Sequence, residues 1–214
     1  MTTRRYSSNL SFVDMLFNLL VGFTSLFILA FLLINPIADE GKIDPVTQLM
    51  ITLTWDPDLP PDLDMHIRTP NGDIVSFRRR DNNWMVLDRD DLGASSDYYV
   101  VNGETLIVKK NVEVVSVNAI VPGEYVVNVH FYGCGGCLAF IEKGGDDARI
   151  DNLLYEIEVI DMHPFKIVYS TIETIKLREE QTVATFIVDE EGNIKDIRTD
   201  IFIPLFTQTG AREW

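Results

Sequence analysis

A continuous apolar run from Leu10 to Ile34 is the feature that most constrains this chain of 214 residues. As a helix, the run would be about 37 Å long, which is enough to cross a hydrocarbon core of about 30 Å. The residues that follow it, 33–37, offer no small-residue cleavage site of the kind that ends a signal peptide. We therefore predict a single uncleaved transmembrane helix over residues 10–35.

The charges on the two sides of this run indicate its orientation. Arg4 and Arg5 precede it, whereas three acidic residues follow it within ten positions. Basic residues favour the cytoplasmic side of a membrane. We therefore expect residues 1–9 in the cytoplasm, a linker over residues 36–45, and the rest of the chain in the periplasm or outside the cell.

Asp14 lies inside the run, where an ionisable group costs several kcal/mol unless it is paired, hydrated or protonated. At about 100° per residue, it falls on a polar and small face that covers an arc of about 80°. That face consists of Ser11, Asp14, Asn18, Gly22 and Ser25. A face of this kind predicts packing against other helices. The competing interpretation is that Asp14 snorkels to the nearby cytoplasmic end or caps the helix.

Residues 9–23, with the sequence NLSFVDMLFNLLVGF, resemble the short N-terminus and single helix of the MotB/ExbD/TolR family. These proteins are the smaller, stator-type subunits of ion-driven motors in the bacterial inner membrane, and the resemblance covers residues 5–36. It implies that two copies of the helix lie inside a pentamer of a multi-span MotA/ExbB/TolQ-like partner. It also implies that Asp14 exchanges H⁺ or Na⁺ as the ion crosses, and that no further cofactor is required.

The rest of the chain is strongly acidic. The net charge is −15, and the first 38 residues carry a net +1, so the remaining 176 residues carry about −16. This charge argues against nucleic acid and anionic lipid as partners of the outer part. It is compatible with cations, basic proteins or simple solubility.

Short apolar segments rich in β-branched and aromatic residues predict strands, and turn sequences such as Asn102-Gly103 separate them. The predicted strands cover residues 50–55, 112–119, 125–131, 154–160, 165–177, 182–189 and 194–203. Together they predict a mainly-β, β-sandwich-like domain, whose compact part we place at residues 46–143. Residues 144–214 either extend this sandwich or form a second small β unit, and the last two strands form a hairpin.

Residues 53–72 and 122–125 resemble a small bacterial extracytoplasmic β-module of undefined function. Its pattern is a Trp-Asp strand, an Asp-Leu-Asp-x-His strand and a Pro-Asn-Gly hairpin, which here are Trp55-Asp56, Asp62 to His66 and Pro70 to Gly72. The resemblance implies a fold and not an activity. The outer domains of the motor family are usually mixed α/β. This difference implies either a specialised motor that contacts a different envelope or surface target, or that the resemblance of the membrane helix is misleading.

Several aspartates in the first half of the outer domain are candidate ligands for Ca²⁺, which prefers oxygen donors. The candidates are Asp56, Asp58, Asp62 and Asp64, with Asp88, Asp90 and Asp91 nearby only if the sheet brings them together. The sequence shows no EF-hand spacing. The competing interpretation is that these are solvated aspartates in turns.

The two cysteines form the sequence Cys134-Gly135-Gly136-Cys137, after the strand predicted at 125–131. A close pair outside the cytoplasm predicts a disulfide. Two alternatives stay open. A redox-active pair normally places its first cysteine at a helix N-terminus, whereas these glycines favour a turn between strands. A zinc site would add His130 but shows no fourth ligand.

The sequence assigns no catalytic residue. His66, His130 and His163 lie apart, and the chain contains neither a Gly-x-Ser-x-Gly elbow nor a phosphate loop. We therefore predict the dimeric inner subunit of an ion-driven motor rather than an enzyme of substrate chemistry, with a β-domain that transmits force. The competing class is a passive membrane-anchored binding or adhesion module, in which Asp14 only helps the anchor to dimerise.

Overall fold

The computed structural model describes residues 10–34, 47–93 and 97–209. The chain divides into two compact units, Met1–Asp44 and Pro45–Trp214. The predicted cytoplasmic N-terminus at 1–9 and the predicted linker at 36–45 lie outside the described residues.

The described part of the first unit is a single helix, α1 (Leu10–Ile34). Leu and Phe dominate its sequence and proline is absent from it, so no proline interrupts the backbone hydrogen bonds. The stretch Leu10–Phe31 has a mean hydropathy of 2.0 and buries none of its residues against the rest of the protein. By length and composition α1 can cross a membrane.

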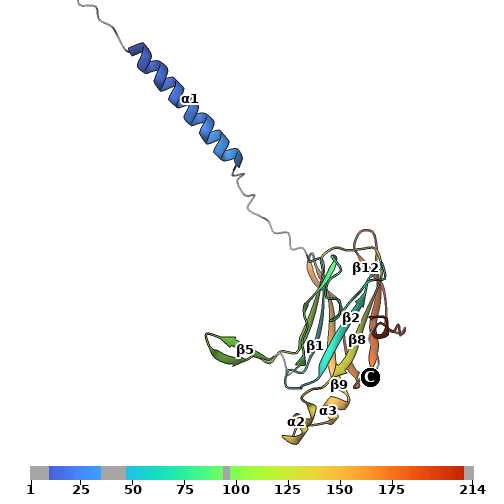
Figure 1. The fold of residues 1–214 in the computed structure, drawn as a ribbon. Coiled ribbons are helices and arrows are strands. Elements are labelled where there is room, and N and C mark those ends of the chain that lie inside the picture. Colours follow the sequence, from blue (N-terminus) through green and yellow to red (C-terminus); the bar gives the residue numbers. More distant parts are fainter. Residues whose placement is uncertain (1–9, 35–46, 94–96, 210–214) are drawn as a thin grey trace, which may run out of the picture. The chain divides into compact units, whose positions relative to one another are not determined.

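The second unit is a sandwich of two five-stranded antiparallel sheets, seen as facing layers in Figure 1. The first sheet has the order β10-β9-β1-β7-β4, with strands β1 (Leu49–Trp55), β4 (Met85–Arg89), β7 (Val112–Val117), β9 (Leu153–Met162) and β10 (Phe165–Ile175). The second has the order β12-β11-β8-β2-β3, with strands β2 (Asp62–Arg68), β3 (Ile74–Val75), β8 (Gly123–Gly133), β11 (Glu180–Val188) and β12 (Ile194–Arg198).

The remaining elements are short. Strands β5 (Tyr98–Val101) and β6 (Glu104–Ile107) pair only with each other, and Asn102 and Gly103 between them both have positive φ, as a two-residue type I′ hairpin turn requires. Helices α2 (Cys137–Glu142) and α3 (Ala148–Asp151) lie beyond one end of the strands in Figure 1. A 3₁₀ turn, η2 (Phe206–Thr209), ends the described chain.

The core lies between the two sheets because each sheet directs alternate side chains inward. In β1, buried residues alternate with half-buried ones from Leu49 to Trp55, and β9 repeats the pattern from Leu153 to Val159. The second sheet supplies the opposing layer, which includes Leu63, Met65, Ile67, Val127, Val129 and Phe131. Alternating burial of this kind is the basis of a two-sheet sandwich.

The predicted fold class, an N-terminal apolar helix followed by a mainly-β sandwich domain, is confirmed. Strand β9 pairs with β1 along its length, and β11 pairs with β8. The strands after residue 143 therefore complete the same two sheets that the earlier strands begin. The predicted hairpin of the last two strands is present as β11 and β12.

One predicted strand is shorter than expected. The segment 194–203 was predicted as one strand, but β12 ends at Arg198 and the chain then crosses the outer face of the second sheet. There the Ile203 carbonyl accepts a hydrogen bond from Asn128 Nδ2 at 2.7 Å. Glu180 Oε1 accepts the backbone N–H groups of Leu205 and Phe206, each at 2.8 Å. This covering segment explains why β8 is buried on both faces from Tyr125 to Phe131.

Candidate functional site

The polar face predicted for the membrane-length helix is present on α1. Asp14, Asn18 and the three other residues of this face are exposed. A Cβ atom added at Gly22 would meet no other atom within 4 Å on the described helix. A glycine here leaves room for the close approach of a second helix.

Two hydroxyl groups of α1 are satisfied within the helix. Thr24 Oγ1 donates to the Leu20 carbonyl at 2.7 Å, and Ser25 Oγ donates to the Val21 carbonyl at 2.8 Å. Back-bonding of this kind lets a hydroxyl sit in an apolar helix without an outside partner. Ser25 is thus satisfied on this face, whereas Asp14 and Asn18 carry its largest polar groups.

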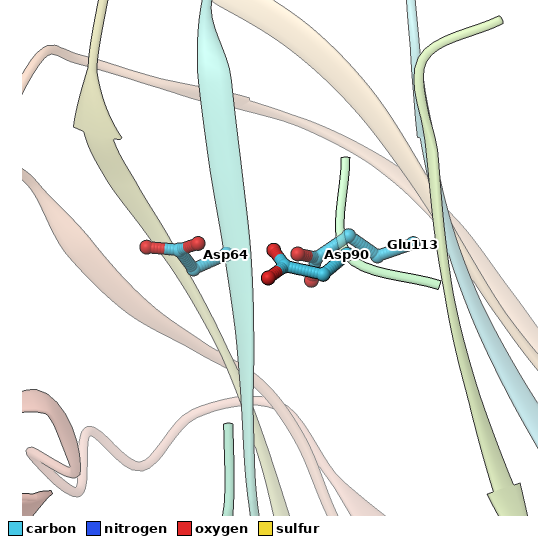
Figure 2. Close-up of side chains that lie close together, drawn as sticks. All are labelled: Asp64, Asp90 and Glu113. Carbon is cyan, nitrogen blue, oxygen red and sulfur yellow. The ribbon is translucent and has the colours of Figure 1, made fainter. Parts of the chain in front are cut away.

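A second group of carboxylates lies in the sandwich, where the two sheets meet along one edge. Asp64 comes from β2 of the second sheet, whereas Glu113 comes from β7 and Asp90 follows β4 in the first sheet. One oxygen atom from each residue lies within 4.8 Å of the others. Figure 2 shows the carboxylates of Asp90 and Glu113 side by side, with Asp64 projecting from β2.

Strand pairing explains how Glu113 reaches this position. Strand β2 pairs with β8 along its length, but it pairs with β3 only at Ile67 and Arg68. The Met65 N–H on the open side therefore has no ladder partner, and it donates to Glu113 Oε2 at 2.6 Å. Glu113 shares the inward direction of Val115 and Val117, so its carboxylate points between the sheets.

The surroundings of these carboxylates are unfavourable for negative charge. Burial raises the pKa of Glu113 well above its usual value, and the charge of Asp64 adds to the shift. Burial also raises the pKa of Asp64 well above its usual value, with a further contribution from Asp62. At the start of β2, burial raises the pKa of Asp62 to about 7, and Asp90 and Asp91 add to this shift.

The cluster of Asp64, Asp90 and Glu113 receives few hydrogen bonds from the described residues. One oxygen of each of the three residues is buried without a hydrogen-bond partner, namely Asp64 Oδ2, Asp90 Oδ1 and Glu113 Oε1, and so is Oδ1 of the neighbouring Asp62. Arg80 Nη1 lies 3.8 Å from Asp90 Oδ2, and the charge of Arg78 acts on Asp64 in the opposite direction to burial. An oxygen-rich, negatively charged group of this kind is suited to a hard cation.

The structure separates the four predicted calcium ligands into two pairs. Asp62 and Asp64 lie at the carboxylate group, whereas Asp56 forms an ion pair with Arg149, and Asp58 forms one with Lys109 at 2.8 Å. The neighbouring aspartates also differ. Asp90 joins the group, Asp88 accepts a hydrogen bond from Ser116, and Asp91 is paired with Arg89 at 2.7 Å.

Sequence reasoning missed Glu113. Its position offered a signal, because it occupies an inward-facing place in a strand whose next inward residues are Val115 and Val117. A glutamate in such a position must find a partner across the core, since an unpaired buried charge is costly. The sequence does not name that partner.

The two strand histidines form part of a buried layer on the outer face of the second sheet. His66 is fully buried, and its ring centroid lies 5.7 Å from Phe206 and 6.1 Å from both Phe77 and His130. Burial lowers the pKa of His66 to about 3 and that of His130 to about 4, so both rings are neutral at pH 7. His163 is exposed in the turn between β9 and β10.

Cys134 and Cys137 form a disulfide, with their Cα atoms 5.4 Å apart. Both residues are half-buried and pack against the core. The chain does not turn directly into another strand, as the glycines suggested, because Cys137 begins α2. In this state neither sulfur is a thiolate that can bind zinc.

No protein-family model matches this chain, and no curated protein matches it. The functional assignment therefore depends on the two carboxylate sites. One is the exposed Asp14 on an apolar helix, and the other is the buried group around Asp64 and Glu113.

Proposed function

We propose that this protein is the inner, dimeric subunit of a proton- or sodium-driven motor in a bacterial inner membrane. Its N-terminus is cytoplasmic, α1 spans the membrane, and the sandwich lies in the periplasm or outside the cell. One observation supports the proposal most strongly: a carboxylate, Asp14, lies within a membrane-length apolar helix on one narrow polar face. Ionisable residues at membrane depth usually mark ion or proton paths.

Ion coupling needs only one titratable group from this chain. A carboxylate can hold a proton while it faces an apolar wall and release it when it faces water or a cation. Moving one charge through a potential of 100 mV supplies about 2.3 kcal/mol. If ion binding changes which partner surface α1 prefers, that free energy drives a step of rotation or tilting.

The path for the ion must come from a partner. Asp14 and Asn18 are exposed on α1, and the described residues of this chain provide no second membrane-length helix. The family resemblance implies a MotA/ExbB/TolQ-like pentamer of multi-span subunits around two copies of α1. Gly22 supports close packing in such an assembly, because an added Cβ would project into open space on α1.

The competing function is a passive membrane-anchored binding module, and the β5-β6 hairpin is the observation that favours it. All eight strand residues of this hairpin are exposed, and they include Tyr98, Val100 and Ile107 at 64%, 73% and 61% exposure. Exposed apolar surfaces often mark contact sites for other molecules. In this alternative the sandwich carries the function, and Asp14 only helps the anchor to dimerise.

The copy number in the native membrane complex separates the two functions. The tagged protein would be extracted in mild detergent from cells that also express its genomic neighbours, and its native mass measured for wild type and Asp14→Asn. We expect two copies inside a ring of a larger membrane protein for both. Thr24→Val is the matched control, because the Thr24 hydroxyl is satisfied within α1. A monomer or a dimer without a membrane partner would contradict the motor and leave the binding module.

A further inference from the structure

We propose that Asp64, Asp90 and Glu113 bind one Ca²⁺ ion at the edge between the two sheets, with Asp62 as an adjoining carboxylate. This site is separate from Asp14, and the proposal does not depend on whether the protein is a motor subunit. Asp64 lies in the second sheet, Glu113 lies in the first, and Asp90 directly follows β4 of the first, so the ion would connect the two layers of the sandwich.

The spacing of the three residues suits a single ion. Ca²⁺ binds oxygen at about 2.3–2.6 Å, so two oxygens on one ion are at most about 5 Å apart. One oxygen from each of Asp64, Asp90 and Glu113 lies within 4.8 Å of the other two. The backbone therefore does not have to move to bring three ligands around one ion.

The burial of unpartnered oxygens is a second and independent observation. Glu113 is 0% exposed and Asp64 is 3% exposed, yet Glu113 Oε1 and Asp64 Oδ2 have no hydrogen-bond partner among the described residues. A buried carboxylate oxygen without a partner is costly. A bound cation would satisfy both oxygens at once.

Other carboxylates of the sandwich show how the chain satisfies such groups when it uses its own donors. Glu180 Oε1 accepts hydrogen bonds from Asn128 Nδ2 and from two backbone N–H groups. Asp91, which is fully buried, is bound by the Arg89 guanidinium through two nitrogens. Glu113, in contrast, is given one backbone donor, from Met65. The contrast indicates that the cluster of Asp64, Asp90 and Glu113 binds a ligand rather than donors of the chain.

The donor set favours Ca²⁺ over other common metal ions. All three ligands are carboxylates, which suit Ca²⁺ and Mg²⁺, whereas Zn²⁺ is commonly held by nitrogen and sulfur. Mg²⁺ demands a near-ideal octahedron at 2.0–2.1 Å and usually keeps several waters, which a buried group accommodates poorly. Arg80, 3.8 Å from Asp90, balances only part of the negative charge.

The alternative is that the carboxyl groups share protons and bind no metal. The test would use the full-length protein in detergent at pH 7.5 and 150 mM NaCl, after EDTA treatment and removal of the chelator. CaCl₂ would be titrated by calorimetry, and thermal unfolding of the sandwich would be followed with and without Ca²⁺. The variants would be Glu113→Gln and Asp64→Asn. Asp58→Asn is the matched control, because Asp58 is an exposed aspartate paired with Lys109 outside the group.

We expect wild type and Asp58→Asn to bind one Ca²⁺ per chain and to unfold at a higher temperature when Ca²⁺ is present. Glu113→Gln and Asp64→Asn should lose both effects. In EDTA they should unfold at the same temperature as wild type or higher, because a neutral amide removes charge repulsion from a buried site. Should either variant fail to fold, Asp90→Asn at a half-buried position gives the same test.

Three results would overturn the proposal. Wild type could show neither heat nor a change in unfolding temperature up to millimolar Ca²⁺, which would leave protonated carboxyl groups as the explanation. Glu113→Gln and Asp64→Asn could bind Ca²⁺ as wild type does, which would place the ion on the acidic surface. A shift with Mg²⁺ as large as that with Ca²⁺ would contradict the assignment to Ca²⁺.

Discussion

Helix α1 and the sandwich both place carboxylates among apolar residues, but they do so in different ways. In α1 the environment is apolar because of local sequence, and Asp14 shares a face with residues three or four positions apart. In the sandwich, Asp64 and Glu113 are 49 positions apart in the chain and meet only because β2 and β7 approach each other. The first site depends on neighbours in sequence, and the second depends on the tertiary fold.

The two regions also differ in what can supply a partner for their carboxylates. Asp14 is exposed on α1, and in the proposed motor its contacts are the ion and a partner subunit. Asp64 and Glu113 are instead buried within their own domain, so a partner for their unpaired oxygens must be small. We infer that α1 packs against other helices and that the carboxylates at the edge of the sandwich bind a cation.

The largest expected effect on stability tests whether the two regions are independent. Leu53→Ala in β1 should destabilise the sandwich by about 2–5 kcal/mol, because Leu53 is fully buried in the centre of the first sheet. Leu20→Ala on α1 should leave the unfolding of the sandwich unchanged, since Leu20 is 64% exposed. Chemical denaturation followed by tryptophan fluorescence measures both. Equal losses in the two variants would contradict the separation into two units.

A pair of matched substitutions sharpens the contrast between satisfied and unsatisfied carboxylates. Glu180→Gln should destabilise the cation-free sandwich by about 1–3 kcal/mol, because three donors converge on one charged oxygen. Glu113→Gln should have no such cost in EDTA, since only Met65 donates to that side chain. Denaturant midpoints in EDTA compare the two. A loss in Glu113→Gln as large as in Glu180→Gln would show that Glu113 has a structural role without metal.

The smallest expected effect is pH-dependent and concerns the turn between β11 and β12. The Lys195 ammonium and the Asn193 N–H lower the pKa of Asp189 to about 2, from about 3.8 in the unfolded chain. A group with a lowered pKa stabilises the fold above its unfolded pKa, and this contribution disappears as the pH falls from 3.8 toward 2.

Asp189→Asn should therefore lower the unfolding temperature slightly at pH 7. The difference from wild type should shrink as the pH falls below 4. Thermal unfolding at several pH values measures it, and Glu191→Gln in the same turn is a control for loss of surface charge. A difference that stays constant down to pH 2 would show that the ion pair with Lys195 is not its cause.

The sequence predicts those parts of the molecule that depend on local pattern. The run from Leu10 to Ile34 is enough to define α1, and alternation is enough to place β1 and the β11-β12 hairpin. The end of β12 at Arg198 was not predictable, because Asn128 and Glu180 on other strands bind the segment that follows. Helix α2 was also missed, since two glycines precede it.

The same limit explains the carboxylate site. The clustering of aspartates in the sequence marks Asp62 and Asp64 as candidate Ca²⁺ ligands. It marks Asp56 and Asp58 equally, although in the structure these two form ion pairs with Arg149 and Lys109. Local sequence cannot distinguish these pairs, because the partners lie more than 25 positions away. Glu113 becomes a candidate only when its inward position is combined with the open edge of β2.

The central claim is that Asp14 carries the ion. It is tested most directly by ion flux into proteoliposomes that contain the complex purified with its membrane partner, at an imposed potential, for wild type, Thr24→Val and Asp14→Asn. We predict flux of H⁺ or Na⁺ with wild type and Thr24→Val, and loss of that flux with Asp14→Asn although the same complex assembles. Equal flux with Asp14→Asn, or none with wild type, would contradict the account.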